Sequence, residues 1–288
     1  EYSFSPDSLL LSVIGINITS VIFSLEAGPK LLGSILVFIG PISLVMIKNK
    51  IKNKESFLFF LILFILCSWM ILLSDARLYL AVLIMFLIIT PVYRMLSTKV
   101  FLQTYLIIFP IIPILLLMIA SYIADIPGME VLSRSADDNI SSLSGRTFIW
   151  SAIAENIQQF NPELLYGYGA AGTVDSGINN QVTYLFKGGW ENTGIKTAHN
   201  IILQQLLDKG IIGVGIFLLV FRSFINTFNA YNHSLSDALL FGVLALMVSA
   251  SLNTLFYYAS SESYVLFLIL LGLHTSKFFE KDDSRSKY

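Results

Sequence analysis

The sequence predicts an all-α polytopic membrane protein, and three observations carry that prediction. Of its 288 residues, 55% are hydrophobic and 13% are charged, and the mean hydropathy is +0.74. An average soluble domain has about twice that charged share. The stretches 56–74, 100–124 and 238–261 carry no charge, and each has nearly or more than the roughly 20 residues that a helix needs to cross a bilayer. The alternating pattern of a membrane β-barrel does not occur in the sequence.

Hydropathy along the chain indicates about eight spans. They lie at residues 8–25, 30–48, 56–74, 77–96, 100–124, 211–229, 237–257 and 262–278. A long polar region separates the fifth span from the sixth. We therefore expect a five-helix part, a loop with short helices, a motif helix with three spans, and a tail, at 1–124, 125–197, 198–279 and 280–288. Because the chain starts at Glu1 and soon enters a span, we expect a trimmed protein or one domain of a longer one.

Lysine and arginine in the short loops set the expected orientation, because cytoplasmic loops are rich in these residues. Loop 48–54 carries four lysines, and the same side of the membrane holds Arg94, Lys99, Arg222 and the basic C-terminal tail. The C-terminus is therefore expected in the cytoplasm, and region 125–197 on the opposite side. A site on that outer side has no access to cytoplasmic ATP or nucleotide sugars, so its substrate must already be activated.

Two arginines on the expected outer side are candidate anion ligands. Arg77 begins the fourth span at its outer end, where arginine is disfavoured, although snorkelling or pairing with Asp75 explains it equally well. Arg146 stands in the first turn of an expected helix, where it opposes the helix dipole unless an anion lies close by. A helix N-terminus is itself an anion site, and arginine can bind a phosphate with two hydrogen bonds. A surface pair with Glu155 is the structural alternative.

His199 is the third candidate, within the segment AHNIILQQLLDKGIIG at 198–213. On a helical wheel over 198–209 it shares the apolar face. The polar residues occupy the opposite arc: Asn200, Gln204, Gln205, Asp208 and Lys209. A histidine on an apolar face is more often a packed residue than a catalyst, yet burial keeps its ring neutral, as a general base for a sugar hydroxyl requires. Gly210 and Gly213 are expected to let this short helix end and turn into the next span.

The outer region argues against several other kinds of site. Region 125–197 holds eight acids and four bases, so a general polyanion surface, and with it a nucleic-acid partner, is not expected. Tyr168 and Trp190 could stack on sugar rings, although such aromatics more often order a loop. The sequence contains no cluster with metal-ligand spacing, and its one cysteine, Cys67, lies in an apolar span. Neither a metal nor another cofactor is expected.

The segment around His199 resembles the O-antigen ligase and polysaccharide polymerase superfamily of bacteria. His199, Asn200, Gly210 and Gly213 match its pattern of His-[Asn/Ser/Gln], nine residues and Gly-x-x-Gly. The resemblance extends over about 56–278 and implies the C-terminal two-thirds of a fold with about a dozen spans.

Two further stretches are similar to elements of the same superfamily. SLSGRTFIW contains Gly145, Arg146 and Trp150 in the pattern Ser/Thr-Gly-Arg-x-x-x-Trp, and NPELLYGYGAAGT is similar to its Pro-x-Leu-Gly-Tyr-Gly run, stretched here over 162–167. LLSDARLYL resembles a Ser-Arg pair at the outer end of an earlier span, with two residues inserted before Arg77.

The resemblance implies a metal-independent glycosyltransferase in the bacterial inner membrane, with its site on the periplasmic face. The donor would be a glycan on undecaprenyl diphosphate, and no cofactor would be needed. His199 would be the general base, and Arg146 and Arg77 would bind the diphosphate and stabilise the leaving group. The remaining roles would be substrate binding by Asn200, Tyr168 and Trp190, and structural support by Gly145, Trp150, Gly210 and Gly213.

Four functions stay open at this point. The compact arrangement of motifs favours a polymerase of O-antigen or exopolysaccharide repeat units, whose acceptor is another lipid-linked glycan. A ligase would instead transfer finished polymer to lipid A–core in lipopolysaccharide biosynthesis. A transporter or flippase of lipid-linked sugars predicts charges near span centres, which the sequence does not favour, and a scaffold leaves the arginines and histidine unexplained. The expected partners are the bilayer, the donor and acceptor glycans, a chain-length regulator and a flippase.

Overall fold

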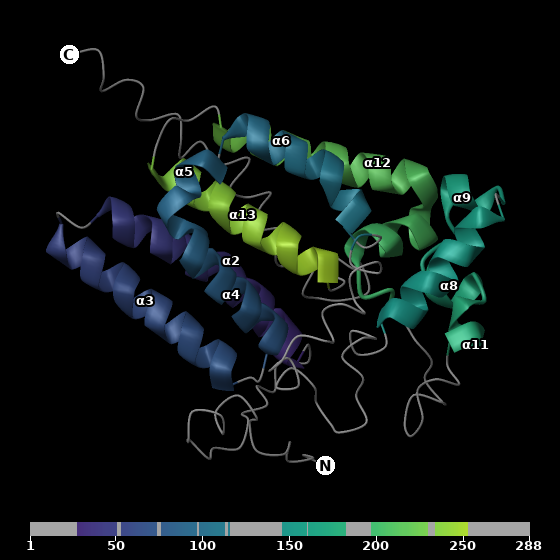
Figure 1. Cartoon of the computed structure of the whole chain (residues 1–288), viewed down its shortest axis with the longest axis horizontal. Helices are drawn as coiled ribbons and strands as arrows, with labels where there is room; N and C mark the ends of the chain where they lie inside the picture. Colours follow the sequence, from purple (N-terminus) through teal and green to yellow (C-terminus); the bar gives the residue numbers. More distant parts are fainter. Residues whose placement is uncertain are drawn as a thin grey trace. The chain divides into compact units, whose positions relative to one another are not determined.

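The computed structural model describes residues 28–50, 53–73, 76–96, 98–112, 115, 146–159, 161–182, 197–229 and 234–252. Within these ranges the secondary structure is helical and includes no strand, which confirms the predicted all-α class (Figure 1). The chain divides into two compact units. The first unit comprises 1–104, 222–249 and 258–288, and the second comprises 105–221 and 250–257.

The first unit contains long apolar helices that pack against one another. In chain order they are α2 (Gly28–Asn49), α3 (Lys54–Leu73), α4 (Arg77–Ile89), η1 (Thr90–Val92), α5 (Tyr93–Leu96), the start of α6 (Lys99–Ile108) and most of α13 (Ser234–Leu252). Figure 1 shows α2, α3 and α4 side by side. A Cβ atom added at Gly40 of α2 would lie 2.6 Å from Cδ1 of Leu83 in α4. Such small residues let helix backbones approach closely, as is common between helices in membranes.

Aromatic rings fill the centre of the first unit. Phe241 of α13 meets Phe86 with ring centroids 4.7 Å apart and Tyr93 with centroids 6.3 Å apart, and all three side chains are buried. The hydroxyl of Tyr93 also donates a hydrogen bond of 2.8 Å to Oδ1 of Asn49. The end of α2 is therefore joined to α5, and the ring contacts pack α13 against α4 and α5.

Within the part of the chain that the structure describes, three helices are long and apolar enough to cross a membrane: Lys54–Leu73, Leu78–Leu96 and Ile201–Phe228. They correspond to the expected spans at 56–74, 77–96 and 211–229. Shorter apolar helices lie at Gly33–Asn49, Lys99–Ile111 and Leu235–Ser251. The expected spans 8–25 and 262–278, and the far ends of 100–124 and 237–257, lie outside the described residues, so the count of eight stays a prediction.

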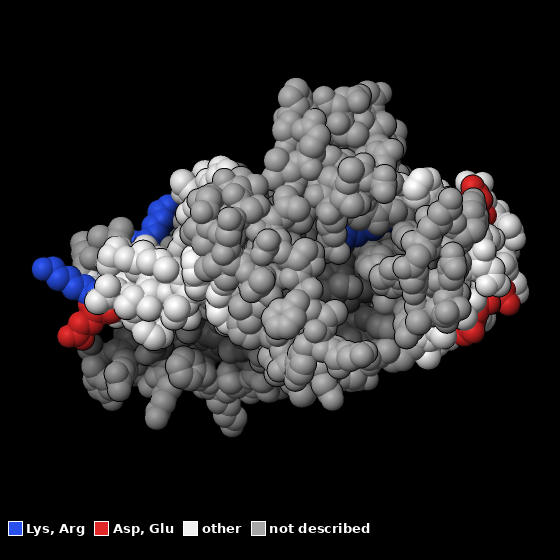
Figure 2. Space-filling model, turned by 90° about the horizontal axis from the view of Figure 1, so that it is seen from below, with Lys and Arg blue, Asp and Glu red and all other residues white. Residues whose placement is uncertain are grey.

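The second unit consists of short helices and most of one long helix. Its elements are η2 (Phe109–Ile111), α8 (Arg146–Gln158), α9 (Glu163–Tyr166), α10 (Gly172–Asp175), α11 (Ile178–Val182) and α12 (Ile201–Asn229) as far as Phe221. Trp150, Ile153, Ile178 and Leu207 belong to its buried apolar core. Figure 2 shows acidic side chains on the surface of the molecule, and α8, α9 and α10 contribute Glu155, Glu163 and Asp175.

Candidate functional site

His199 has a backbone conformation that residues other than glycine rarely adopt. Its φ is +50°, the one positive φ at a described residue other than glycine. The helix α12 begins only at Ile201, so the expected helical wheel starting at residue 198 is wrong for His199. A left-handed residue immediately before a helix persists only where its surroundings hold it. The ring is half-buried, and its Nδ1 atom is shielded from solvent.

Trp150 holds the residue that precedes His199. Its indole Nε1 donates a buried hydrogen bond of 2.8 Å to the carbonyl oxygen of Ala198. Trp150 lies one helical turn after Arg146 in α8, about 6 Å along the axis. The start of α8 and the backbone at His199 therefore belong to one small region of the second unit. The side chain of Trp150 links the helix that begins at Arg146 to the backbone at His199, although Arg146 and His199 are 53 residues apart in the sequence.

Asn200 holds the residue that follows His199. Its Oδ1 accepts a hydrogen bond of 3.0 Å from the backbone N–H of Leu203, the geometry of a helix N-cap. Its Nδ2 donates a hydrogen bond of 2.5 Å to the carbonyl oxygen of Ser251 in α13. The side chain is fully buried, and both of its polar groups contact the protein's own backbone.

Four of the five residues of the predicted polar arc are buried, which the helical wheel did not predict, and the fifth, Lys209, is exposed. Asn200 and Gln204 are 0% exposed, Asp208 is 3% and Gln205 is 5% exposed. Oε1 of Gln204 accepts a hydrogen bond of 2.7 Å from the N–H of Ala198, and Nε2 of Gln204 donates one of 2.9 Å to Oδ1 of Asp208. Asp208 Oδ1 also accepts one of 3.1 Å from the N–H of Gly172. The sequence signal for this network is the spacing of four residues between Asn200, Gln204 and Asp208 in a largely apolar chain.

Glycines let the segment after α9 lie directly against α12. A Cβ atom at Gly172 would lie 2.6 Å from the carbonyl carbon of Leu207, and one at Gly167 would collide with the backbone of Asp208 and Lys209. The N–H groups of Tyr168 and Gly169 donate hydrogen bonds of 2.7 and 3.1 Å to the carbonyl oxygens of Leu207 and Asp208. The motifs at 161–173 and 198–213 therefore pack directly against each other.

Gly210 makes the bend that the sequence predicted. Its φ of +64° and ψ of −165° interrupt α12, and a Cβ there would collide with the backbone of Leu165 and Tyr166. That region of backbone space is open almost only to glycine. The helix after Gly210 continues as the apolar span.

The motif geometry agrees with the comparison against protein families. A family model described as O-antigen ligase matches residues 61–218, more than half of the chain. The chain belongs to the O-antigen ligase family. The match includes Arg77, Arg146, His199 and both glycines of the Gly-x-x-Gly motif. No curated protein and no solved structure matches the chain. Family membership and the apolar helices identify a bacterial membrane protein with an activity of the ligase or polymerase type.

The structure places the other candidate residues of this O-antigen ligase family member as follows. Arg77 is the first residue of α4 and belongs to the first unit, whereas Arg146 and His199 belong to the second. Gly213 lies within α12, where it is buried and approached closely by Lys209. Gly145 and Trp190 lie outside the described residues.

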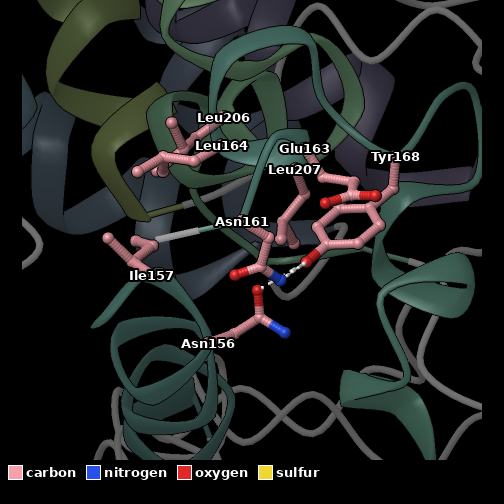
Figure 3. Close-up of a pocket in the computed structure, with 8 residues that line it drawn as sticks. All are labelled: Asn156, Ile157, Asn161, Glu163, Leu164, Tyr168, Leu206 and Leu207. Atoms are coloured by element: carbon pink, nitrogen blue, oxygen red, sulfur yellow. Dashed lines mark hydrogen bonds between the residues drawn. The ribbon is translucent and has the colours of Figure 1, made fainter. Parts of the chain in front are cut away.

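A small hollow in the second unit contains Tyr168 (Figure 3). Its empty volume, part of it open solvent, is about 250 Å³. The lining residues are Asn156, Ile157, Asn161, Glu163, Leu164, Tyr168, Leu206 and Leu207. The hydroxyl of Tyr168 donates a hydrogen bond of 2.8 Å to Oδ1 of Asn156 and accepts one of 3.1 Å from Nδ2 of Asn161 (Figure 3). These bonds orient the tyrosine ring within the hollow.

Proposed function

We propose that this protein moves a glycan from undecaprenyl diphosphate to a sugar hydroxyl on the periplasmic face of the inner membrane, and so polymerises O-antigen or exopolysaccharide repeat units. The observation that carries the proposal is the fixed backbone of His199, which Trp150 ties to the helix that begins at Arg146. A base next to an anion-binding helix end suits transfer from a diphosphate-linked donor. Membership of the O-antigen ligase family supports the same chemistry.

In the proposed reaction, His199 takes the proton from the acceptor hydroxyl. The acceptor oxygen then forms a bond to the anomeric carbon, and the bond from that carbon to the diphosphate oxygen breaks, with inversion. Undecaprenyl diphosphate leaves with the electron pair. The shielding of Nδ1 from solvent favours Nε2 as the nitrogen that accepts the proton.

Arg146, with Arg77, is proposed to bind the diphosphate and to stabilise the charge that develops on it. Support comes from the position of Arg146 at the start of α8, a helix of 13 residues with no acid in its first turn. The helix dipole and the guanidinium then act on the same anion. Loss of one such group costs on the order of 10²–10³ in rate. No metal is required in this scheme.

The remaining candidates are proposed to serve the sugars. Tyr168 lines the hollow of Figure 3, and an aromatic ring can stack on a pyranose. Trp190 is proposed to act in the same way. Asn200 is proposed to support substrate binding indirectly, by holding the backbone of His199, because both polar groups of its side chain bond to the protein.

A ligase is the second candidate, and the description of the family favours it. In that case the donor glycan would be a finished polymer and the acceptor a sugar of lipid A–core. The displacement at the anomeric carbon, with His199 as base and Arg146 on the diphosphate, would be the same.

The test is a deletion strain complemented with the His199→Ala variant and examined on a polysaccharide gel. We expect single-repeat glycan on lipid A–core if a polymerase is lost, and bare core with free polymer if a ligase is lost. His233→Ala, at a position expected on the cytoplasmic side, is the matched control and should leave the gel pattern of the wild type. An unchanged pattern in a well-expressed His199→Ala strain would refute the enzymatic proposal.

A further inference from the structure

The strongest unexplained feature of the second unit is a carboxylate buried in an apolar chain. Asp208 is 3% exposed, and its Oδ1 accepts hydrogen bonds from Gln204 and from the N–H of Gly172. Its Oδ2 is also buried and has no hydrogen-bond partner among the described residues. A buried, half-satisfied carboxylate opposes folding, and such groups are retained mainly where they serve a function.

The carboxylate fixes the orientation of a neighbouring amide. A glutamine side chain can present either its oxygen or its nitrogen to a partner, and the hydrogen bonds decide which. Because Nε2 of Gln204 donates to Asp208, its Oε1 faces the other way and accepts the N–H of Ala198 at 2.7 Å. The hydroxyl of Thr173 contacts the same Oε1 at 3.4 Å. Asp208 and the N–H of Ala198 therefore select the same orientation of the amide from its two ends, and loss of Asp208 removes one of these two constraints.

The amide in turn acts on the residue before His199. Ala198 is fully buried and is held from both sides, by Gln204 at its N–H and by Trp150 at its carbonyl oxygen. His199 follows with its φ of +50°. A left-handed backbone at a histidine costs free energy, so the peptide in front of it must be held in place for the ring to keep one direction.

We propose that Gln204 and Asp208 are positioning residues for His199, acting through the N–H of Ala198 and touching neither glycan. This role rests on the proposed function, in which His199 is the base. Its chemical basis is the chain of hydrogen bonds from Gly172 through Asp208 and Gln204 to Ala198. Release of that chain lets the imidazole leave its productive direction while the substrate sites stay intact.

Gln204→Met tests the proposal, because methionine has the length of glutamine without its hydrogen-bonding groups. With purified full-length chain and an undecaprenyl diphosphate-linked repeat unit as substrate, we expect kcat to fall about 10- to 100-fold, the cost of misplacing a reacting group. The KM for the donor should match that of Gln205→Met, whereas the Tm should be somewhat lower, because the N–H of Ala198 and Oδ1 of Asp208 each lose a buried partner. That control removes an equally buried glutamine at the next position of α12.

A double variant, Q204E/D208N, tests the hydrogen-bond chain itself. The introduced glutamate would accept hydrogen bonds from the N–H of Ala198 and from the amide of the introduced asparagine. In the wild type the N–H of Gly172 and Nε2 of Gln204 both donate to Oδ1 of Asp208, so an asparagine amide that takes over the bond to residue 204 gives up the bond from Gly172. The two bonds that connect residue 208 to the N–H of Ala198 are kept, with donor and acceptor exchanged between the two side chains, so kcat should recover above that of Gln204→Glu alone. This pair of variants decides the matter even if Gln204→Met does not accumulate.

Any of three results would overturn the positioning role. Two of them are equal kcat in Gln204→Met and Gln205→Met, and a loss of kcat that only follows the loss of folded protein. No recovery in the double variant would do the same. His199→Ala separates this inference from the proposed function. If His199→Ala is inactive and Gln204→Met is fully active, only the positioning role fails, whereas full activity of His199→Ala removes both.

Discussion

The two units bury different kinds of side chain. In the first unit, the ring centroids of Phe86 and Phe241 lie 4.7 Å apart. The hydroxyls of buried Ser43 and Ser249 donate hydrogen bonds to carbonyl oxygens of their own helices. In the second unit, buried polar groups bond across long stretches of sequence, as Trp150 does to Ala198. Close packing of side chains holds the first unit together, whereas in the second unit directed hydrogen bonds fix the backbone around His199. Stability and catalysis should therefore respond to different substitutions in the two units.

The physical reason lies in what each kind of contact contributes to stability in its surroundings. Lipid tails are as apolar as leucine, so helices in a membrane gain from close packing rather than from hydrophobic transfer. A buried hydrogen bond is directional, and an unmade one is costly in a low dielectric. A polar network therefore suits the task of holding one backbone conformation, and an apolar interface suits the task of holding helices together.

The largest effect is expected at Gly210, where the second unit depends on backbone shape. Gly210→Ala places a Cβ against the backbone of Leu165 in a conformation nearly closed to alanine, at a cost of about 3 kcal/mol or more. We expect almost no folded protein, measured as the monodisperse peak of detergent-solubilised chain in size-exclusion chromatography.

The control for Gly210 lies five residues further along the same helix. Gly215 is exposed, helical and free of any described atom within 4 Å of an added Cβ. Gly215→Ala should be neutral or stabilising by about 0.5–1 kcal/mol. Equal yields of the two variants would show that the bend at Gly210 does not determine the fold.

An intermediate effect is expected in the first unit, at Phe241. Phe241→Ala leaves a cavity between Phe86 and Tyr93 and should destabilise by on the order of 2 kcal/mol, which is below the usual range of about 3–5 kcal/mol because lipid provides no transfer contribution. The Tm should fall, while the activity per folded molecule should stay at the wild-type value. Both are measured on one detergent preparation.

Ile88→Ala is the control for that substitution, because Ile88 of α4 is 70% exposed and its loss leaves no cavity. Its Tm should lie close to that of the wild type. A Phe241→Ala variant with normal Tm and reduced turnover would contradict the division of labour between the units.

Much of the fold could be predicted from the sequence, because hydropathy adds up over the length of a span. The helices at Lys54–Leu73 and Leu78–Leu96 agree with the expected spans within a few residues. The special positions His199 and Gly210 emerged from motif spacing, and the glycine's φ of +64° gives that spacing a physical cause. The bend needs a residue without a side chain.

The arrangement around His199 could not be predicted in the same way. A helical wheel describes one helix and assumes its start, and it cannot reveal that α12 begins at Ile201 or that His199 is left-handed. It identified the polar arc of α12 but not what covers that arc. The covering group at Gly172 lies 36 residues before Asp208, and such a contact depends on the tertiary fold.

The smallest effect is expected from Asn200→Ser, and it separates two roles for Asn200. Serine is a good N-cap and keeps an acceptor for the N–H of Leu203, but it cannot reach the carbonyl oxygen of Ser251. Loss of that one hydrogen bond should lower stability by about 1 kcal/mol and turnover by a few-fold. Asn200→Ala loses the cap as well and should fall further in both. If serine and alanine instead reduce turnover equally, with equal Tm values, capping is not what matters, and the direct contact with substrate that the family resemblance implies becomes the better explanation.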